Sequence, residues 1–249
     1  MFSKHKFCYL YSKIEQMKKV LLLAVFAFAL NANAQETKDV DQTDETVTYK
    51  YEYEDDDDWS THVFIGVNFP TYVPDNVDFA PFRSWEFDIT VAQYDYTLNN
   101  SKTTLSAGAG LGWRFYTLSG HDDMFYKDGN LIDVTKRDGS MSELSSSIRT
   151  FNINVPLLVK QRLAKNFAVS LGAQANWNCY ARVNNSYEVG DNEIDVNTKK
   201  IGQRPITVDV LGILHFAKDF GVYFKYSPMS VMKKDRGPEF KSFTVGIYL

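Results

Sequence analysis

Apolar and polar residues alternate along eight separate segments of the chain between Trp59 and Leu249. A period of two places successive side chains on opposite faces of a β-strand, and no segment with a helical period lies between them. The alternating segments are 59–69, 85–91, 105–115, 151–160, 167–178, 206–215, 220–227 and 243–249. We therefore predict an all-β chain in which eight antiparallel strands run up and down.

The polar face of these segments carries mainly small residues and a few ionisable ones. Small side chains suit the narrow lumen of an eight-stranded barrel, whereas a sheet facing water usually carries long charged side chains. A soluble, lipocalin-like barrel is the alternative, because its strands also alternate but turn their apolar face inward. We predict a transmembrane barrel with a charge-balanced polar network in its lumen. The predicted network consists of Glu86, Asp88, Arg114, Lys160, Asp209, His215 and Lys225.

All four tryptophans lie on the apolar face of a predicted strand, near its end: Trp59, Trp85, Trp113 and Trp177. Transmembrane barrels carry aromatic girdles where the apolar core of the bilayer meets water. The tilted strand from Trp59 to Phe69 would rise about 25 Å, which is the height of the apolar band. The competing interpretation is that aromatic residues simply favour strands. We predict that these tryptophans contact outer-membrane lipid.

The links between the predicted strands alternate in length. The links at about 70–83, 117–148, 182–203 and 228–238 are long, and those at about 97–102, 161–165 and 217–219 are shorter. Short periplasmic turns and long extracellular loops are typical of membrane barrels. With an even number of strands, both ends of the barrel domain (59–249) would lie in the periplasm.

The start of the chain has the pattern of a secretory signal peptide. Met17-Lys18-Lys19 is positively charged, residues 20–30 are apolar, and Ala32-Asn33-Ala34 supplies the small residues of a cleavage site. We predict a signal peptide over 1–34, with Gln35 as the mature start and residues 1–16 upstream of the natural start codon. A retained helical anchor is the alternative, but the apolar run is too short to span a bilayer.

Residues 35–58 are strongly acidic and end in the run from Glu54 to Asp58. Such a block repels itself and predicts a disordered periplasmic lead-in. A calcium- or partner-binding role, or a short strand around the alternating tyrosines, is the alternative. The whole chain has a net charge of −4 and no basic stripe, which argues against a nucleic-acid partner.

The histidines after the predicted signal peptide, His62, His121 and His215, are the residues best suited to acid–base chemistry. No convincing nucleophile accompanies them at a barrel rim. The oxygen-rich residues at 121–130 lack the spacing of a calcium loop, and the glycines at 108–112 lie within a strand rather than before a helix. We therefore predict no enzyme activity, no metal site and no cofactor.

Three further runs resemble segments of a known family: 153–160 (INVPLLVK), 167–173 (FAVSLGA) and 221–227 (GVYFKYS). On the basis of these runs, which are moderately specific for that family, the chain from about 59 to 249 resembles the PorT-like outer-membrane β-barrel family. The last run, 243–249, resembles the C-terminal signal that the barrel-assembly machinery reads, but it ends in Leu249 rather than phenylalanine. The resemblance implies an outer-membrane location and makes a proline within a strand a feature of the family.

These patterns predict a non-enzymatic outer-membrane barrel with a filled lumen and no large pore. It would bind or adhere to an extracellular partner through the loops at 117–148 and 182–204. One alternative is an enzyme acting on lipid or peptide at the extracellular rim, with His62 or His121. Another, which the resemblance suggests, is an accessory component of transport or secretion whose acidic lead-in contacts a periplasmic protein.

Overall fold

The computed structural model describes residues 59–249, apart from 76, 99–101, 121, 137–141 and 218–219. The predicted signal peptide (1–34) and acidic lead-in (35–58) lie outside the described residues, as does His121. Within the described part, the one helical element is the short turn η1 (Pro81–Arg83), and no helix there is long and apolar enough to cross a membrane.

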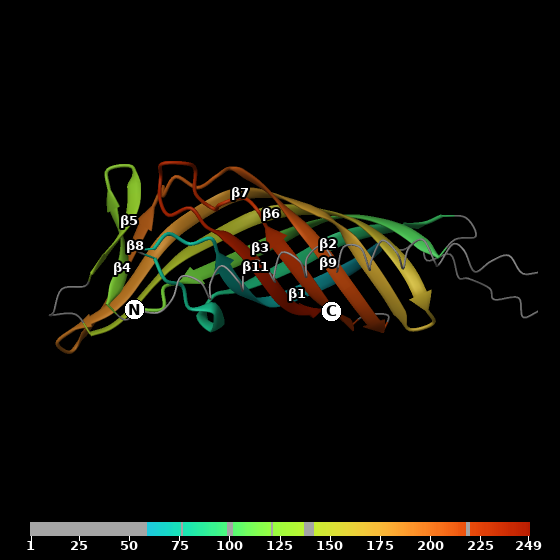
Figure 1. Cartoon of the computed structure of the whole chain (residues 1–249), viewed down its shortest axis with the longest axis horizontal. Coiled ribbons are helices and arrows are strands. Elements are labelled where there is room, and N and C mark those ends of the chain that lie inside the picture. Colours follow the sequence, from blue (N-terminus) through green and yellow to red (C-terminus); the bar gives the residue numbers. More distant parts are fainter. Residues whose placement is uncertain (1–58, 76, 99–101, 121, 137–141, 218–219) are drawn as a thin grey trace, which may run out of the picture. The chain divides into compact units, whose positions relative to one another are not determined.

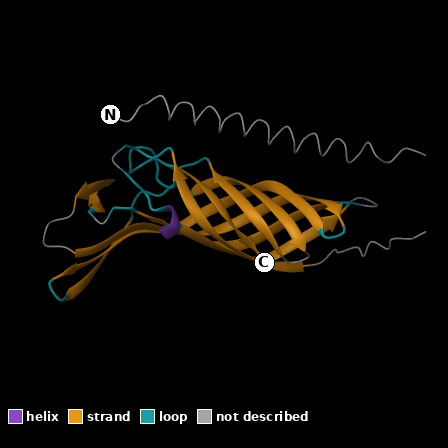
Figure 2. Ribbon diagram, turned by 60° about the horizontal axis from the view of Figure 1, so that its bottom comes forward, coloured by secondary structure: helices purple, strands orange, loops and turns teal. Residues whose placement is uncertain are grey.

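Eight antiparallel strands close into a barrel (Figures 1 and 2). They are β1 (Trp59–Thr71), β2 (Trp85–Thr97), β3 (Thr103–Thr117), β6 (Ser142–Ala164), β7 (Phe167–Val189), β9 (Ile206–Ala217), β10 (Phe220–Ser227) and β11 (Lys241–Tyr248). Around the barrel the order is β6, β3, β2, β1, β11, β10, β9, β7, and β7 pairs back with β6. Each strand therefore neighbours the next barrel strand along the chain, and the predicted eight-stranded up-and-down arrangement is confirmed.

The barrel closes where its first strand meets its last. Phe64 of β1 pairs with Tyr248 of β11, and the backbone of Val63 exchanges two hydrogen bonds with that of Leu249. Closure leaves no unpaired strand edge around the ring, which is the feature that lets strands exist in lipid.

The links have different lengths at the two ends of the barrel. Links 98–102, 165–166 and 218–219 are short, and we call this end, which also holds Leu249, the turn end. Links 72–84, 118–141, 190–205 and 228–240 are long, and we call the opposite end the loop end. The predicted alternation of link length is confirmed.

The loop end contains more strand than the sequence indicated. β6 and β7 each run for 23 residues and continue past the barrel. β8 (Asn192–Lys199) pairs with the outer part of β7, and β4 (Asp123–Asp128) forms a hairpin with β5 (Leu131–Lys136). The predicted boundaries of strands 151–160 and 167–178 were therefore wrong. Beyond the apolar belt the outward side chains are polar, for example Ser145 and Ser147, so the alternation that marks the rest of β6 is lost.

Pro156 lies in the middle of β6 without causing a bulge. The β3–β6 ladder pairs Ala107 with Leu157 and Gly110 with Asn154 in the same register, and no pairs are formed between these positions. A proline has no N–H to donate, which accounts for the interruption. Its ring faces Gly108, where a Cβ would lie only 3.2 Å from Pro156 Cγ, so the glycine makes room for it.

Candidate functional site

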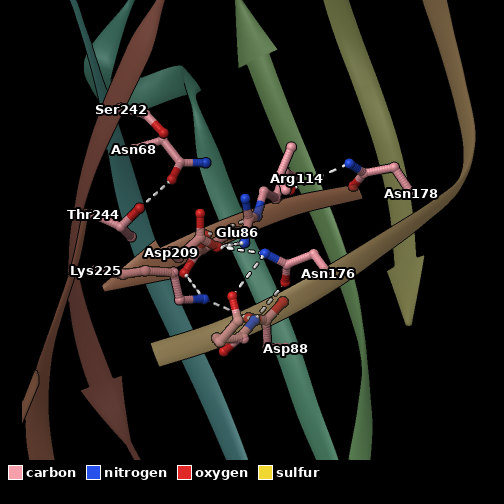
Figure 3. A network of polar contacts seen from close by, with 12 residues as sticks. Asn68, Glu86, Asp88, Arg114, Asn176, Asn178, Asp209, Lys225, Ser242 and Thr244 are labelled. Atoms are coloured by element: carbon pink, nitrogen blue, oxygen red, sulfur yellow. Dashed lines mark hydrogen bonds and ion pairs between the residues drawn. The ribbon is translucent and has the colours of Figure 1, made fainter. Parts of the chain in front are cut away.

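Five ionisable side chains form a network inside the barrel (Figure 3). Glu86 and Asp88 come from β2, Arg114 from β3, Asp209 from β9 and Lys225 from β10, and all five are buried. Alternation places each of them on the inward face of its strand, and the closed ring aims them at one another.

Ion pairs in this network reach across the lumen. Lys225 Nζ lies 2.7 Å from Glu86 Oε1 and 2.5 Å from Asp88 Oδ2. Arg114 lies 2.5 Å from Asp209 Oδ2 through Nη2, and 3.3 Å from Glu86 Oε2 through Nε. Both cations therefore bridge strands that are not neighbours in the ring, so the side chains fill the lumen.

Neutral side chains extend the network. Asn176 Nδ2 donates to Asp209 Oδ2 at 2.8 Å, and Gln174 Nε2 donates to Asp88 Oδ2 at 3.2 Å. The hydroxyl of Tyr223 donates a hydrogen bond to Glu86 Oε1 at 2.9 Å. Tyr223 is not part of the network predicted from the sequence, although its position two residues before Lys225 on the same face of β10 marks it as inward. Each of the five charges therefore has an oppositely charged partner, which is the condition under which ions are buried in a protein.

Lys160 and His215 do not belong to this network, so the predicted set of seven needs correction. Both lie near the turn end, at the end of β6 and of β9, and they line a separate cavity. His215 Nε2 hydrogen-bonds Ser170 Oγ at 2.7 Å instead of meeting a carboxylate. Alternation shows only that these residues face inward, whereas their height follows from their position along the strand: Lys160 pairs with Thr104 and His215 with Gly221, both near the turn end.

The cavity at the turn end has a volume of about 310 Å³. His62 stacks on the ring of Tyr248 at a centroid distance of 4.7 Å, and His215 meets the same ring edge to face at 5.1 Å. Lys160 and Arg162 line the same cavity, which makes its surroundings mainly cationic. We call it the turn-end cavity.

An apolar layer separates the turn-end cavity from the ionic network. It consists of Phe64, Leu158, Leu211, Ile213, Tyr223 and Tyr248, all of them buried. Lys225 Nζ lies 6.0 Å from the ring centroid of Phe64 and 5.5 Å from that of Tyr223, so the ions rest directly on this layer.

A second apolar cluster closes the loop end, and we call it the cap core. All four long links or the strands beside them contribute to it: Val77, Phe79, Tyr116, Leu118, Phe125, Ile132, Ile148, Ala181, Val183, Ile201, Val231, Met232 and Phe240. Phe79 and Phe240, from the first and last long links, have ring centroids 4.7 Å apart. The long links are thus packed into one folded cap.

Polar contacts fix the β4–β5 hairpin to β6 and β7. Ser146 Oγ accepts from the backbone of Phe125 at 2.9 Å, and Asn185 Nδ2 donates to the carbonyl of Phe125 at 2.8 Å. Within the hairpin, Lys136 Nζ lies 2.6 Å from Asp123 Oδ1, and this hydrogen bond raises the pKa of Lys136 above its ordinary value.

The four tryptophans lie on the outside of the barrel. Trp59 is 73% exposed at the turn end, and Trp85 and Trp177 are 42% and 61% exposed toward the loop end. Trp113 is half-buried between the rings of Phe87 and Phe151, with centroid distances of 5.9 Å and 5.1 Å. Three of the four therefore lie toward the loop end, and contact with lipid remains a prediction for all of them.

Apolar side chains cover the outer wall between these aromatic residues. Leu157 and Leu171 are more than half exposed, while the ions of the network are almost completely buried. A soluble barrel would have the opposite distribution, with its apolar side chains inside. A closed ring with an apolar exterior and an ion-filled interior defines a β-barrel of the transmembrane class.

Comparison with known proteins adds weak likenesses of fold. No family model matches the chain, and no curated protein matches it. Among solved structures, Ail, the attachment invasion locus protein of Yersinia pestis, is 11% identical and covers 77% of this chain and 97% of its own, with a TM-score of 0.35. Neisserial surface protein A is 10% identical and covers 77% of this chain and 98% of its own, also with a TM-score of 0.35. Scores this low carry no argument, so the class rests on the geometry of the barrel itself.

Proposed function

We propose that this barrel spans the outer membrane of a Gram-negative cell and serves as a non-enzymatic anchor for an extracellular binding surface. The predicted signal peptide and the short links at the turn end support a periplasmic turn end. The resemblance of 153–160 and 221–227 to the PorT-like family supports the same location. The cap would then face the outside of the cell.

The observation that carries the proposal is the sheet of β6, β7 and β8, which continues beyond the barrel. β8 ends this sheet, and among the described residues its backbone pairs with β7 alone. An unpaired strand edge offers a row of N–H and C=O groups to another strand. Recognition by strand addition uses such an edge, with side-chain pockets supplying specificity. We therefore infer that the ligand is an extended polypeptide segment.

The filled lumen supports binding rather than conduction. The cap core, the ionic network and the apolar layer above the turn-end cavity lie one after another along the barrel. Small barrels of this size have interiors that side chains can fill. We accordingly expect no large pore.

The alternative of an enzyme at the extracellular rim loses one of its two candidate residues. His62 lies beside Tyr248 in the turn-end cavity, so it cannot serve a site at the loop end. The alternative of a transport or secretion accessory is supported by the turn-end cavity, which would open toward the periplasm in the proposed orientation. A periplasmic protein partner is therefore the second candidate.

Selection of peptides from a phage-displayed library on the full-length protein in nanodiscs tests the proposal. We expect enriched peptides to bind the wild type and to bind Val196→Lys about tenfold more weakly, since an added lysine blocks a strand edge. Leu131→Lys, at the hairpin tip, is the matched control, because both residues are about 40% exposed. Equal binding to Val196→Lys, or no enrichment at all, would sink the proposal.

A further inference from the structure

Three basic residues stand side by side on the outer wall at the loop end. In the strand ladders Phe115 of β3 pairs with Arg149 of β6, Arg149 pairs with Arg182 of β7, and Arg182 pairs with Lys199 of β8. Adjacent strands lie about 4.8 Å apart, so the three cations form one continuous row. We call Arg149, Arg182 and Lys199 the basic row.

The basic row faces away from the lumen. The neighbours of Arg149 in β6, Ile148 and Thr150, are buried on the inward face. The neighbours of Arg182 in β7, Ala181 and Val183, are buried in the cap core. Because successive side chains of a strand point to opposite faces, both arginines point outward. Lys199 is directly opposite Arg182 and shares its face.

The height of the basic row coincides with the edge of the aromatic belt. Phe115 stacks on Trp85 at a centroid distance of 4.1 Å, and the guanidinium of Arg149 lies 5.7 Å from the centre of the Phe115 ring. Two residues further toward the turn end, Phe151 packs against Trp113. Aromatic side chains mark the boundary of the apolar bilayer core, so the row lies at the level of the headgroups.

The row has an excess of positive charge that the described residues do not balance. Two like charges directly opposite each other destabilise a strand pair, yet Arg149 faces Arg182. No carboxylate among the described residues forms an ion pair with either arginine. Arg149 donates from Nε to the neutral Ser147 Oγ, at 3.2 Å. One acid on the same face, Asp195 of β8, interacts electrostatically with Arg149 and pairs opposite Ser186, four residues from Lys199 along the strand. Its single negative charge opposes three cations, so the row keeps an excess of positive charge.

We propose that the basic row binds phosphate groups of an anionic lipid headgroup in the outer leaflet. The proposal rests on the membrane orientation given above. A phosphate between Arg149 and Arg182 accepts paired hydrogen bonds from both guanidinium groups and removes their mutual repulsion. The acyl chains of the same lipid then lie along the apolar wall below Phe115 and Phe151. A flat lateral wall next to the aromatic belt favours a lipid over a soluble phosphate compound.

Native mass spectrometry of the full-length protein in detergent, titrated with phosphatidic acid or phosphatidylcholine, tests this site. We expect the wild type to retain phosphatidic acid in preference to phosphatidylcholine. The double variant Arg149→Gln/Arg182→Gln should retain it about tenfold less well, because it loses the charge-assisted bonds. The matched control is Lys233→Gln/Lys234→Gln, which removes two exposed charges from the link before β11 and should behave as the wild type.

Competition with inorganic phosphate distinguishes a lipid headgroup from a free phosphate as the ligand. If it does not displace phosphatidic acid at millimolar concentration, the site recognises a lipid; if it displaces the lipid fully, the lipid assignment is wrong. Equal retention of phosphatidic acid by the double variant and the wild type overturns the site itself. Heat-modifiable gel migration shows that each variant is folded. Because the lipid measurement involves no peptide, the peptide selection can fail without changing the result of the lipid measurement.

Discussion

Arg114 and Asp209 meet inside the barrel with Nη2 and Oδ2 2.5 Å apart, although 95 residues separate them in the sequence. Their strands, β3 and β9, are not neighbours in the ring, so the pair ties two walls of the lumen together. Both side chains are almost completely buried, and each therefore depends on the other to offset the loss of water.

Replacing Asp209 should strongly destabilise the barrel. Asp209→Asn leaves Arg114 buried with only the weaker pairing to Glu86, and loss of one partner of a buried pair costs about 3–5 kcal/mol. The free energy of unfolding in urea, followed by heat-modifiable gel migration, measures the effect. Asp195→Asn, at an exposed position, serves as the control. An unchanged unfolding midpoint for Asp209→Asn would show that the network contributes no stability.

Substitution of Gly66 should also destabilise the barrel, because it displaces a side chain that belongs to the same network. A Cβ at Gly66 would collide with Tyr223 Oη and lie 2.8 Å from Thr244 Cγ2. Gly66→Ala therefore displaces the hydroxyl that Tyr223 donates to Glu86, and overpacking of this kind costs about 1–3 kcal/mol. At Gly212 the nearest heavy atoms lie 3.8 Å from the added Cβ, so Gly212→Ala should be tolerated. Equal unfolding midpoints for the two variants would contradict this account.

The filled lumen predicts very low conductance. In planar bilayers the wild type should show no stable porin-like current steps. Phe240→Ala, which weakens the cap core, should also remain closed, because the ionic network and the layer containing Phe64 and Tyr223 still block the barrel. Large regular steps from the wild type would mean that the lumen opens in a membrane.

The outward tryptophans predict quenching from the lipid side. In variants that retain only Trp59 or only Trp177, the fluorescence should be quenched more by lipids brominated near the headgroup than by lipids brominated at the chain ends. Acrylamide in the aqueous phase should quench only weakly. Strong acrylamide quenching without any effect of brominated lipid would place these indoles in water and refute the transmembrane assignment.

The alternation of the sequence was enough to predict the ring and the side of the wall on which most residues lie. Trp113 faces out and Arg114 faces in because adjacent residues of a strand must take opposite sides. Phe64 breaks the alternation of its segment, since it is an apolar residue on the inward face, and it is buried in the apolar layer of the lumen. Link lengths were equally predictable, since they depend only on where alternation stops.

Heights and long-range contacts were not predictable in this way. Lys160 lies away from Arg114 because it pairs with Thr104 at the turn end of β3, whereas Arg114 pairs with Thr150 toward the loop end of β6, and alternation gives only the face. The cap core depends on contacts such as Phe79 with Phe240, whose positions only the closed ring brings together. The outer part of β6 was missed because its outward positions, such as Ser145 and Ser147, carry polar side chains, so the apolar–polar alternation is lost there.

The backbone bonds between Val63 and Leu249 have a consequence for biogenesis. The ring cannot close until β11 is present, because β11 is the strand that pairs with the free side of β1. A chain that lacks β11 would leave β1 and β10 each with an unpaired edge, which favours aggregation over partial activity. Barrel closure therefore has to follow the arrival of the β11 segment at the membrane.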